Sequence, residues 1–168
     1  RDIVDYRLAL KCLAYESLRL VQNSVTVIRI NKYERCVILK KTVKILIVDD
    51  EAYIRRVLEL KLRNKGYEVF VAADGVEGLE KLNLYEPEVV ITDIKMPGMD
   101  GRALCEKINN SNNDKPYLII VVTCSVSDSN MRWINNMRDT LLLEKPFSPS
   151  RVLDAIEGYI KSSDTKKS

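Results

Sequence analysis

The chain has 168 residues, of which 46% are hydrophobic and 30% are charged, and this composition is typical of a folded domain with an ordinary packed core. No apolar stretch approaches the roughly 20 residues that a membrane-spanning helix needs, and residues 1–20 lack the apolar core of a signal peptide. We therefore expect a cytoplasmic protein that does not bind a membrane.

The formal net charge of +3 comes from the two ends of the chain. Residues 43–160 contain 15 Lys and Arg against 19 Asp and Glu, whereas residues 1–42 contain 9 against 4 and residues 161–168 contain 3 against 1. Because the central part is mildly acidic, the pI of 8.6 is weak evidence for a nucleic-acid surface. We expect no direct contact with nucleic acid.

The sequence contains four cysteines and no histidine. Since the cysteines show no CxxC spacing, a zinc site and a disulfide framework are not supported, and reduced, buried thiols are the simpler interpretation. The missing histidine excludes a histidine base and a histidine phosphate donor from these residues.

From Val43 to Ile160 the sequence alternates short apolar strands with amphipathic helices. The expected strands are 44–49, 67–72, 87–93, 117–123 and 140–144, and the expected helices are 52–65, 74–85, 102–108, 127–137 and 148–160. Strands rich in Val and Ile without alternation are typical of a parallel sheet that is buried on both faces. Right-handed crossovers then place helices on both faces, which predicts a doubly wound α/β fold.

The sequence also predicts which residues cap these helices and which side chains face the core. Asp74 is expected to cap the second helix and Ser148 the last one. The helix over 74–85 is expected to turn Val76, Leu79 and Leu82 inward, and the helix over 127–137 to turn Met131, Ile134 and Met137 inward. Trp133 is expected to be a half-buried anchor, with a contact to a partner as the alternative.

The two ends of the chain do not follow this alternation. We divide the sequence into an N-terminal extension at 1–42, a folded domain at 43–160 and a flexible basic tail at 161–168. Within the extension, a helix is expected at 5–21 and short strands at 25–30 and 36–39. Two origins of the extension stay open: translation from upstream of a start at Val43, or the tail of a preceding domain.

Polar residues stand where four of the expected strands end. Asp49 and Asp50 close the first strand, Asp93 the third and Thr123 the fourth, and Lys145 follows the fifth. Each alone has a simpler explanation as a helix cap, a turn residue or a solvated charge. In an open parallel sheet, however, ligands bind beyond the carboxyl ends of the strands, so the set converges on one crevice. Three carboxylates favour Mg²⁺, and a hydroxyl with an ammonium suits a phosphoryl group.

These residues, in this order, resemble the receiver domain of two-component response regulators. The resemblance covers about 43–160 and rests on the blocks 45–51, 92–101, 122–123 and 145–147 together with the strand and helix pattern between them. Among such receivers, the sequence resembles the single-domain receivers of the chemotaxis type. The resemblance implies a flavodoxin-like (βα)5 fold whose parallel sheet has the strand order 2-1-3-4-5.

The resemblance also implies a role for each site residue. Asp93 is the phosphoacceptor, and Thr123 and Lys145 contact the phosphoryl group. The peptide bond between Lys145 and Pro146 is expected to be cis. The implied Mg²⁺ ligands are Asp49, largely through water, Asp50, Asp93 and the backbone carbonyl of Lys95. Lys95 and Ser125, each two residues after a site residue, are expected to tune the lifetime of the phosphate.

The function implied by the resemblance is that of a signalling module rather than an enzyme with turnover. The phosphoryl group would come from a histidine kinase or a histidine phosphotransfer protein, and the chain's own chemistry would be limited to accepting and losing it. A downstream protein would bind the face formed by the fourth helix and fifth strand, and a weak homodimer is a further option. The alternatives are a receiver fragment of a hybrid kinase or larger regulator and, less favoured, an aspartyl-phosphate phosphohydrolase. Such hydrolases usually carry a second Asp where Lys95 stands.

Two features depart from the pattern of many receivers. Leu142 occupies the position three residues before Lys145, where an aromatic side chain usually reports phosphorylation. The segment 128–139 lacks the usual small residues and carries Trp133 instead. We therefore expect the phosphate site to be complete and the transmission of the signal to differ.

Overall fold

The computed structural model describes residues 25–29, 36–40, 42–110, 118–124, 127–137 and 139–165. They belong to two units, divided between Lys41 and Thr42. In the first, β1 (Val25–Arg29) and β2 (Cys36–Lys40) pair antiparallel, with Val27 opposite Ile38. This confirms the two short strands expected there. The helix expected at 5–21 lies outside the described residues.

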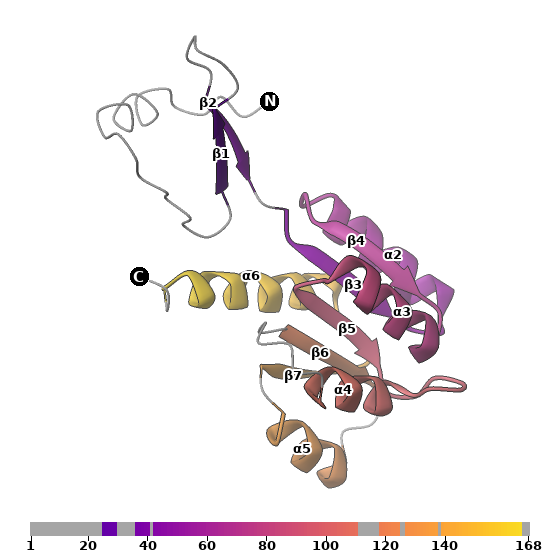
Figure 1. Ribbon diagram of the computed structural model, residues 1–168. Helices are drawn as coiled ribbons and strands as arrows, with labels where there is room; N and C mark the ends of the chain where they lie inside the picture. The colour runs from indigo at the N-terminus through magenta and orange to yellow at the C-terminus, as the bar shows by residue number, and fades with distance from the viewer. Residues whose placement is uncertain are drawn as a thin grey trace. The chain divides into compact units, whose positions relative to one another are not determined.

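The second unit is built on a parallel sheet of five strands in the order β4-β3-β5-β6-β7, which is 2-1-3-4-5 along the chain and confirms the predicted fold (Figure 1). Its strands are β3 (Lys44–Val48), β4 (Glu68–Ala72), β5 (Val89–Asp93), β6 (Leu118–Thr123) and β7 (Thr140–Glu144). β5 and β6 are buried at every position because helices cover both faces of the sheet centre.

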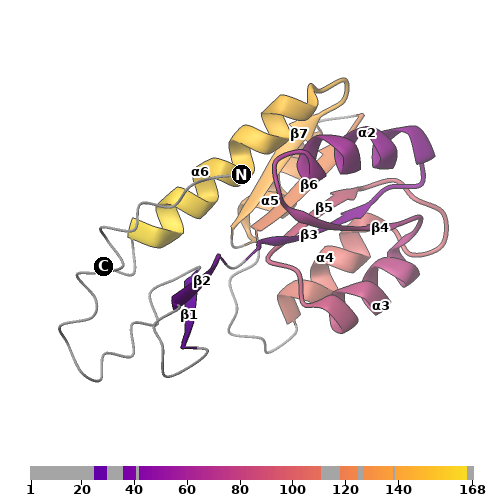
Figure 2. The ribbon, with the colours of Figure 1, turned by 90° about the horizontal axis from the view of Figure 1, so that it is seen from above.

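Helices cover the two faces of this sheet. They are α2 (Ala52–Arg63), α3 (Gly75–Tyr85), α4 (Gly101–Asn110), α5 (Asp128–Asn135) and α6 (Pro149–Thr165). Figure 2 shows α2 and α6 on one face and α3 and α4 on the other. Within the described residues, none of the helices has the length and apolar character that crossing a membrane requires. The cytoplasmic location stays a prediction.

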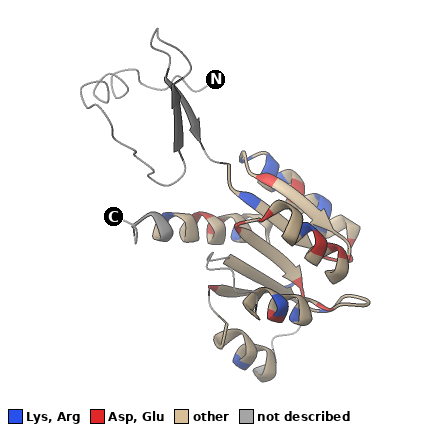
Figure 3. Ribbon diagram, in the orientation of Figure 1, with Lys and Arg blue, Asp and Glu red and all other residues tan. Residues whose placement is uncertain are grey.

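The core consists of two apolar layers, one on each face of the sheet. In β3, Ile45 and Ile47 enter the layer under α2 and α6, whereas Leu46 and Val48 enter the layer under α3, α4 and α5. This alternation follows from the pleat, which turns successive side chains to opposite faces. Basic and acidic residues are interspersed along the covering helices (Figure 3).

The inner face of α3 contains Leu79 and Leu82, as expected, but differs from the expectation at Val76. Asp74 caps the helix as expected, accepting hydrogen bonds from the backbone N–H groups of Val76 and Glu77 at 2.8 and 2.9 Å. The Val76 side chain, however, is 51% exposed. The helix packs through glycine instead, since a Cβ at Gly78 would lie 3.1 Å from the side chain of Val48. The close approach of α3 to β3 therefore turns Val76 outward.

Ile134 of α5 and Met137 just after it face the core, as expected, but Met131 differs from the expectation. Met131 is 39% exposed, whereas Trp133 is only 8% exposed and belongs to the same core layer as Ile134. The prediction of a half-buried Trp133 is therefore wrong, and so is the inward position of Met131. The Arg102 guanidinium of α4 lies 5.2 Å from the centre of the Trp133 ring, which covers the indole and links α4 to α5.

The helix boundaries differ from the predicted ones by a few residues: α2 ends at Arg63 rather than at 65, α5 covers Asp128–Asn135 rather than 127–137, and α4 and α6 extend further than predicted. Helix α6 begins at Pro149, as expected, but continues to Thr165, so residues 161–165 are helical rather than part of a flexible tail. No Pro or Gly lies between Ile160 and Thr165 to end the helix. Helix α4 includes Asn109 and Asn110, which we expected in a polar linker.

Candidate functional site

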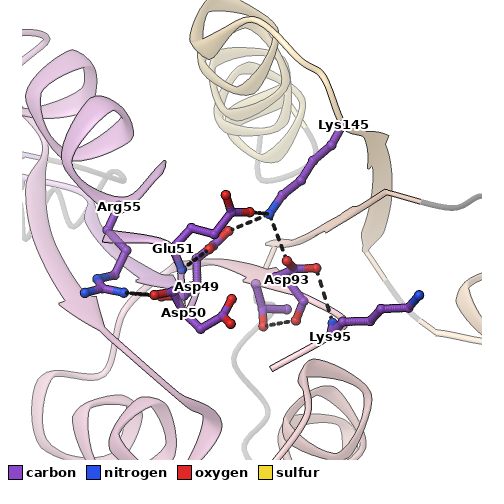
Figure 4. Close-up of polar contacts among 8 residues, drawn as sticks. Asp49, Asp50, Glu51, Arg55, Asp93, Lys95 and Lys145 are labelled. Carbon is purple, nitrogen blue, oxygen red and sulfur yellow. Dashed lines mark hydrogen bonds and ion pairs between the residues drawn. The ribbon is translucent and has the colours of Figure 1, made fainter. Parts of the chain in front are cut away.

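The acidic residues and the lysine meet at the carboxyl end of the sheet (Figure 4). Asp49 directly follows β3, Asp93 ends β5, and Lys145 directly follows β7. The Nζ atom of Lys145 lies 2.8 Å from Oδ2 of Asp93 and 3.1 Å from Oδ2 of Asp49. These three residues, which are far apart in the sequence, thus form one hydrogen-bonded cluster, as predicted from their positions at strand ends.

Asp50 joins the two other aspartates in a group that could hold a metal ion. Asp49, Asp50 and Asp93 each offer a carboxylate oxygen, and these oxygens lie within 4.8 Å of one another. Asp49 and Asp93 are buried, whereas Asp50 is exposed and opens the group to solvent. Burial raises the pKa of Asp49, although hydrogen bonds from the Glu51 N–H and from Lys145 oppose this shift. Three oxygen ligands of this kind fit a hard divalent cation.

Lys145 supplies a fixed positive charge to this group. Its ammonium donates to Asp93, to Asp49 and, at 2.8 Å, to Oε1 of Glu51. Burial alone would lower the pKa of Lys145, but the hydrogen bonds to Asp93, Glu51 and Asp49 together raise it above its ordinary value. The peptide bond between Lys145 and Pro146 is cis, as expected.

Arg55 holds the loop that carries the two aspartates. Its NH1 group donates to the backbone carbonyls of Asp49, at 2.5 Å, and Asp50, at 2.9 Å. In Figure 4 the Arg55 side chain lies on the far side of this loop from Lys145. The guanidinium therefore binds the backbone and leaves the carboxylates of both residues available to a ligand.

The backbone of Asp93 is fixed by the start of α4. The Gly101 N–H donates to the carbonyl of Ile94 at 3.0 Å, and a Cβ at Gly101 would lie 1.8 Å from the carbonyl oxygen of Asp93. The Lys95 N–H donates to Oδ1 of Asp93 at 3.2 Å. Only glycine at position 101 allows this contact. The loop between β5 and α4 thereby orients the Asp93 carboxylate.

Thr123, at the end of β6 between β5 and β7, lies at the same edge of the sheet. Thr123 is only 1% exposed, and its backbone carbonyl accepts a hydrogen bond of 2.8 Å from the backbone N–H of Lys145. Ser125 lies outside the described residues. Leu142 is partly buried and packs against the layer that contains Trp133, while Leu141 is 42% exposed.

Comparison with known proteins agrees with this geometry. The family model of the response regulator receiver domain matches residues 45–157. The chain therefore belongs to the receiver domains of two-component response regulators. Proteins of this family bind Mg²⁺ at an acidic pocket, interact with histidine kinases and are not enzymes in the ordinary sense.

Solved structures and curated relatives support the assignment. The chemotaxis protein CheY4 of Vibrio cholerae is 32% identical, with a TM-score of 0.64 over 69% of this chain and 97% of that one. A CheY-like receiver domain protein of Methanospirillum hungatei is 31% identical, with a TM-score of 0.67 over 76% and 99%. The probable transcriptional regulator ycf27 of Porphyridium aerugineum is 35% identical over 125 residues, 74% of this chain and 51% of that protein. The chain thus spans about half the length of such curated relatives.

Proposed function

We propose that this protein accepts a phosphoryl group on Asp93 from a histidine kinase or a histidine phosphotransfer protein, in a reaction that depends on Mg²⁺. The observation that carries the proposal is the position of the buried Asp93 carboxylate, hydrogen-bonded to Lys145 and grouped with Asp49 and Asp50. Because these 168 residues contain no histidine, the donor histidine lies outside them, or the donor is a small molecule.

The step is the displacement of a donor from phosphorus. A carboxylate oxygen of Asp93 forms a bond to phosphorus while the bond from phosphorus to the donor nitrogen breaks, and the imidazole keeps that electron pair. The Lys145 ammonium offsets charge on the phosphoryl oxygens, and the Thr123 hydroxyl donates to one of them. Mg²⁺, when bound, offsets the negative charge of the carboxylates and of the phosphoryl group. Its proposed ligands are Asp49, Asp50, Asp93 and the Lys95 carbonyl.

Phosphorylation by a small donor tests this proposal. Incubation with Mg²⁺ and acetyl phosphate should add one phosphoryl group at Asp93, detected by intact-mass analysis and peptide mapping, and removal of Mg²⁺ with a chelator should prevent it. Asp93→Asn should abolish the label. Asp154→Asn, which changes an exposed carboxylate on α6, should leave it intact. Persistence of the label in Asp93→Asn would contradict the proposal.

The proposed output surface is formed by α5 and β7, where Met131 and Leu141 are 39% and 42% exposed. A downstream protein would bind there. The protein would also form a weak homodimer, which sedimentation would detect. Because Leu142 replaces the usual aromatic residue, the signal would pass through the layer that Leu142 shares with Trp133.

The length of the relatives bears on whether this receiver domain is part of a larger protein. We propose that 43–160 is the receiver domain and that 1–42 is a separate extension. A role as part of a larger regulator is favoured by the match to about half of proteins named as transcriptional regulators. A DNA-binding function would then reside outside the matched residues. The phosphohydrolase alternative has less support, because Lys95 stands where such enzymes place a second Asp.

A further inference from the structure

Each hydrogen of the Lys145 ammonium meets a different carboxylate. The acceptors are Asp93 and Glu51, both at 2.8 Å, and Asp49 at 3.1 Å. The Lys145 side chain is only 10% exposed, so a buried ammonium with three donors obtains its acceptors from the protein rather than from water. A phosphoryl oxygen that binds Lys145 must therefore replace one of these three carboxylates.

Glu51 is the carboxylate that is easiest to replace. Its side chain is 56% exposed, whereas those of Asp49 and Asp93 are 4% and 8% exposed. Both aspartates also accept a backbone N–H, from Glu51 and Lys95 respectively. Among the described hydrogen bonds, the Glu51 carboxylate accepts only that of Lys145, and it makes no capping bond to α2. When released, it returns to water at little cost.

We propose that Glu51 is a positioning residue that occupies one N–H of Lys145 in the unphosphorylated site and yields it to the incoming phosphoryl group. The inference rests on the proposed acceptance of a phosphoryl group by Asp93. In Figure 4 the Glu51 carboxylate lies beside the Lys145 ammonium. Its negative charge also repels an anionic donor. Glu51 thereby slows phosphorylation by competing for Lys145 and by adding charge at the entrance.

Glu51→Gln removes the charge and keeps the size of the side chain. With acetyl phosphate and saturating Mg²⁺, we expect the initial rate of Asp93 labelling to rise by about three- to tenfold, the effect of one nearby charge in a partly solvated site. Glu59→Gln is the matched control, because it removes the same charge from within α2, the helix that Glu51 precedes, where Glu59 pairs with Arg56 and Arg63. Its rate should stay within about twofold of that of the unchanged protein.

Three further measurements separate the effect of the Glu51 contact from the effect of its charge. Glu51→Asp keeps the charge but is one methylene too short for the same contact, so its rate should rise less than that of Glu51→Gln. The advantage of Glu51→Gln should also shrink as salt is added, because screening weakens the repulsion. Beryllofluoride, a noncovalent mimic of the phosphoryl group, should bind Glu51→Gln more tightly by a similar factor.

The outcomes distinguish this inference from the proposed function. A Glu51→Gln protein that is labelled at Asp93 at the unchanged rate or more slowly overturns the role of Glu51, as does an equal acceleration in Glu59→Gln. Failure of the unchanged protein to be labelled, or labelling in Asp93→Asn, instead overturns the proposed function. Thermal unfolding of each variant verifies that the fold is intact.

Discussion

Lys145 offsets part of the negative charge of the site, and its removal should therefore weaken the fold. Lys145→Met leaves the buried carboxylates of Asp49 and Asp93 without their cation, so the free energy of unfolding in the absence of Mg²⁺ should fall by about 2–4 kcal/mol at neutral pH. Urea unfolding measures this change. The exposed Lys107 provides the control, since Lys107→Met should change stability by less than about 0.5 kcal/mol.

The same residue predicts a pH dependence. The pKa of Lys145 is raised in the folded protein above its ordinary value of 10.5. Its contribution to stability is therefore complete below the unfolded pKa and is lost as the pH rises through the folded pKa. Urea unfolding at increasing pH should show an alkaline loss of stability in the unchanged protein that is smaller in Lys145→Met. Equal losses in both proteins would contradict this assignment.

The residues of the site were predictable from the sequence to different degrees. Asp49, Asp93 and Lys145 were predictable because strand ends in a parallel sheet lie at one edge, whatever the side-chain conformations are. Glu51 and Arg55 were not. Their contacts depend on rotamers of long side chains at the start of α2, and a helical Glu or Arg more often points into solvent.

At the scale of an element, the start of α4 is the most constrained position near the site. Gly101→Ala would place a methyl group 1.8 Å from the Asp93 carbonyl oxygen and 2.8 Å from Oγ1 of Thr92. The backbone cannot move aside as a flexible side chain can, so we expect the unfolding free energy to fall by about 2–3 kcal/mol, as measured by urea unfolding. We also expect slower labelling of Asp93.

Gly158 in α6, unlike Gly101, has room for a larger side chain. A Cβ at Gly158 would meet nothing within 4 Å, so Gly158→Ala should raise the unfolding free energy by about 0.5–1 kcal/mol through helix propensity. Labelling of Asp93 should not change. A loss of stability in Gly158→Ala would contradict this expectation.

The packing of the helices shows what periodicity alone does not determine. The apolar positions of α3 and α5 predicted the right helices but misplaced Val76 and Met131. The other side chains predicted to face inward do so, namely Leu79, Leu82, Ile134 and Met137. In α3, Gly78 faces Val48 and Val76 is left exposed, while in α5 Trp133 replaces Met131 in the core. A hydrophobic pattern treats Gly as neutral and Met and Trp alike, whereas packing depends on their sizes.

At the scale of the molecule, the strand order and the doubly wound layers were predictable because buried strands alternate with amphipathic helices under a fixed crossover handedness. The buried residues of both core layers lie between Ile45 and Ile156. Every site residue described above lies within the same span. Folding and phosphorylation should therefore depend on the second unit alone.

Two truncations test this division. A chain that begins at Thr42 should unfold at the same temperature as the full chain, and its Asp93 should be labelled at a rate within about twofold, because no buried core residue of the second unit is lost. A chain that ends before Pro149 should fail to unfold cooperatively, because it loses Val152, Leu153 and Ile156 from the layer under α2 and α6. Calorimetry and intact-mass labelling measure both. Slower labelling in the chain that begins at Thr42 would show that residues 1–41 act on the site.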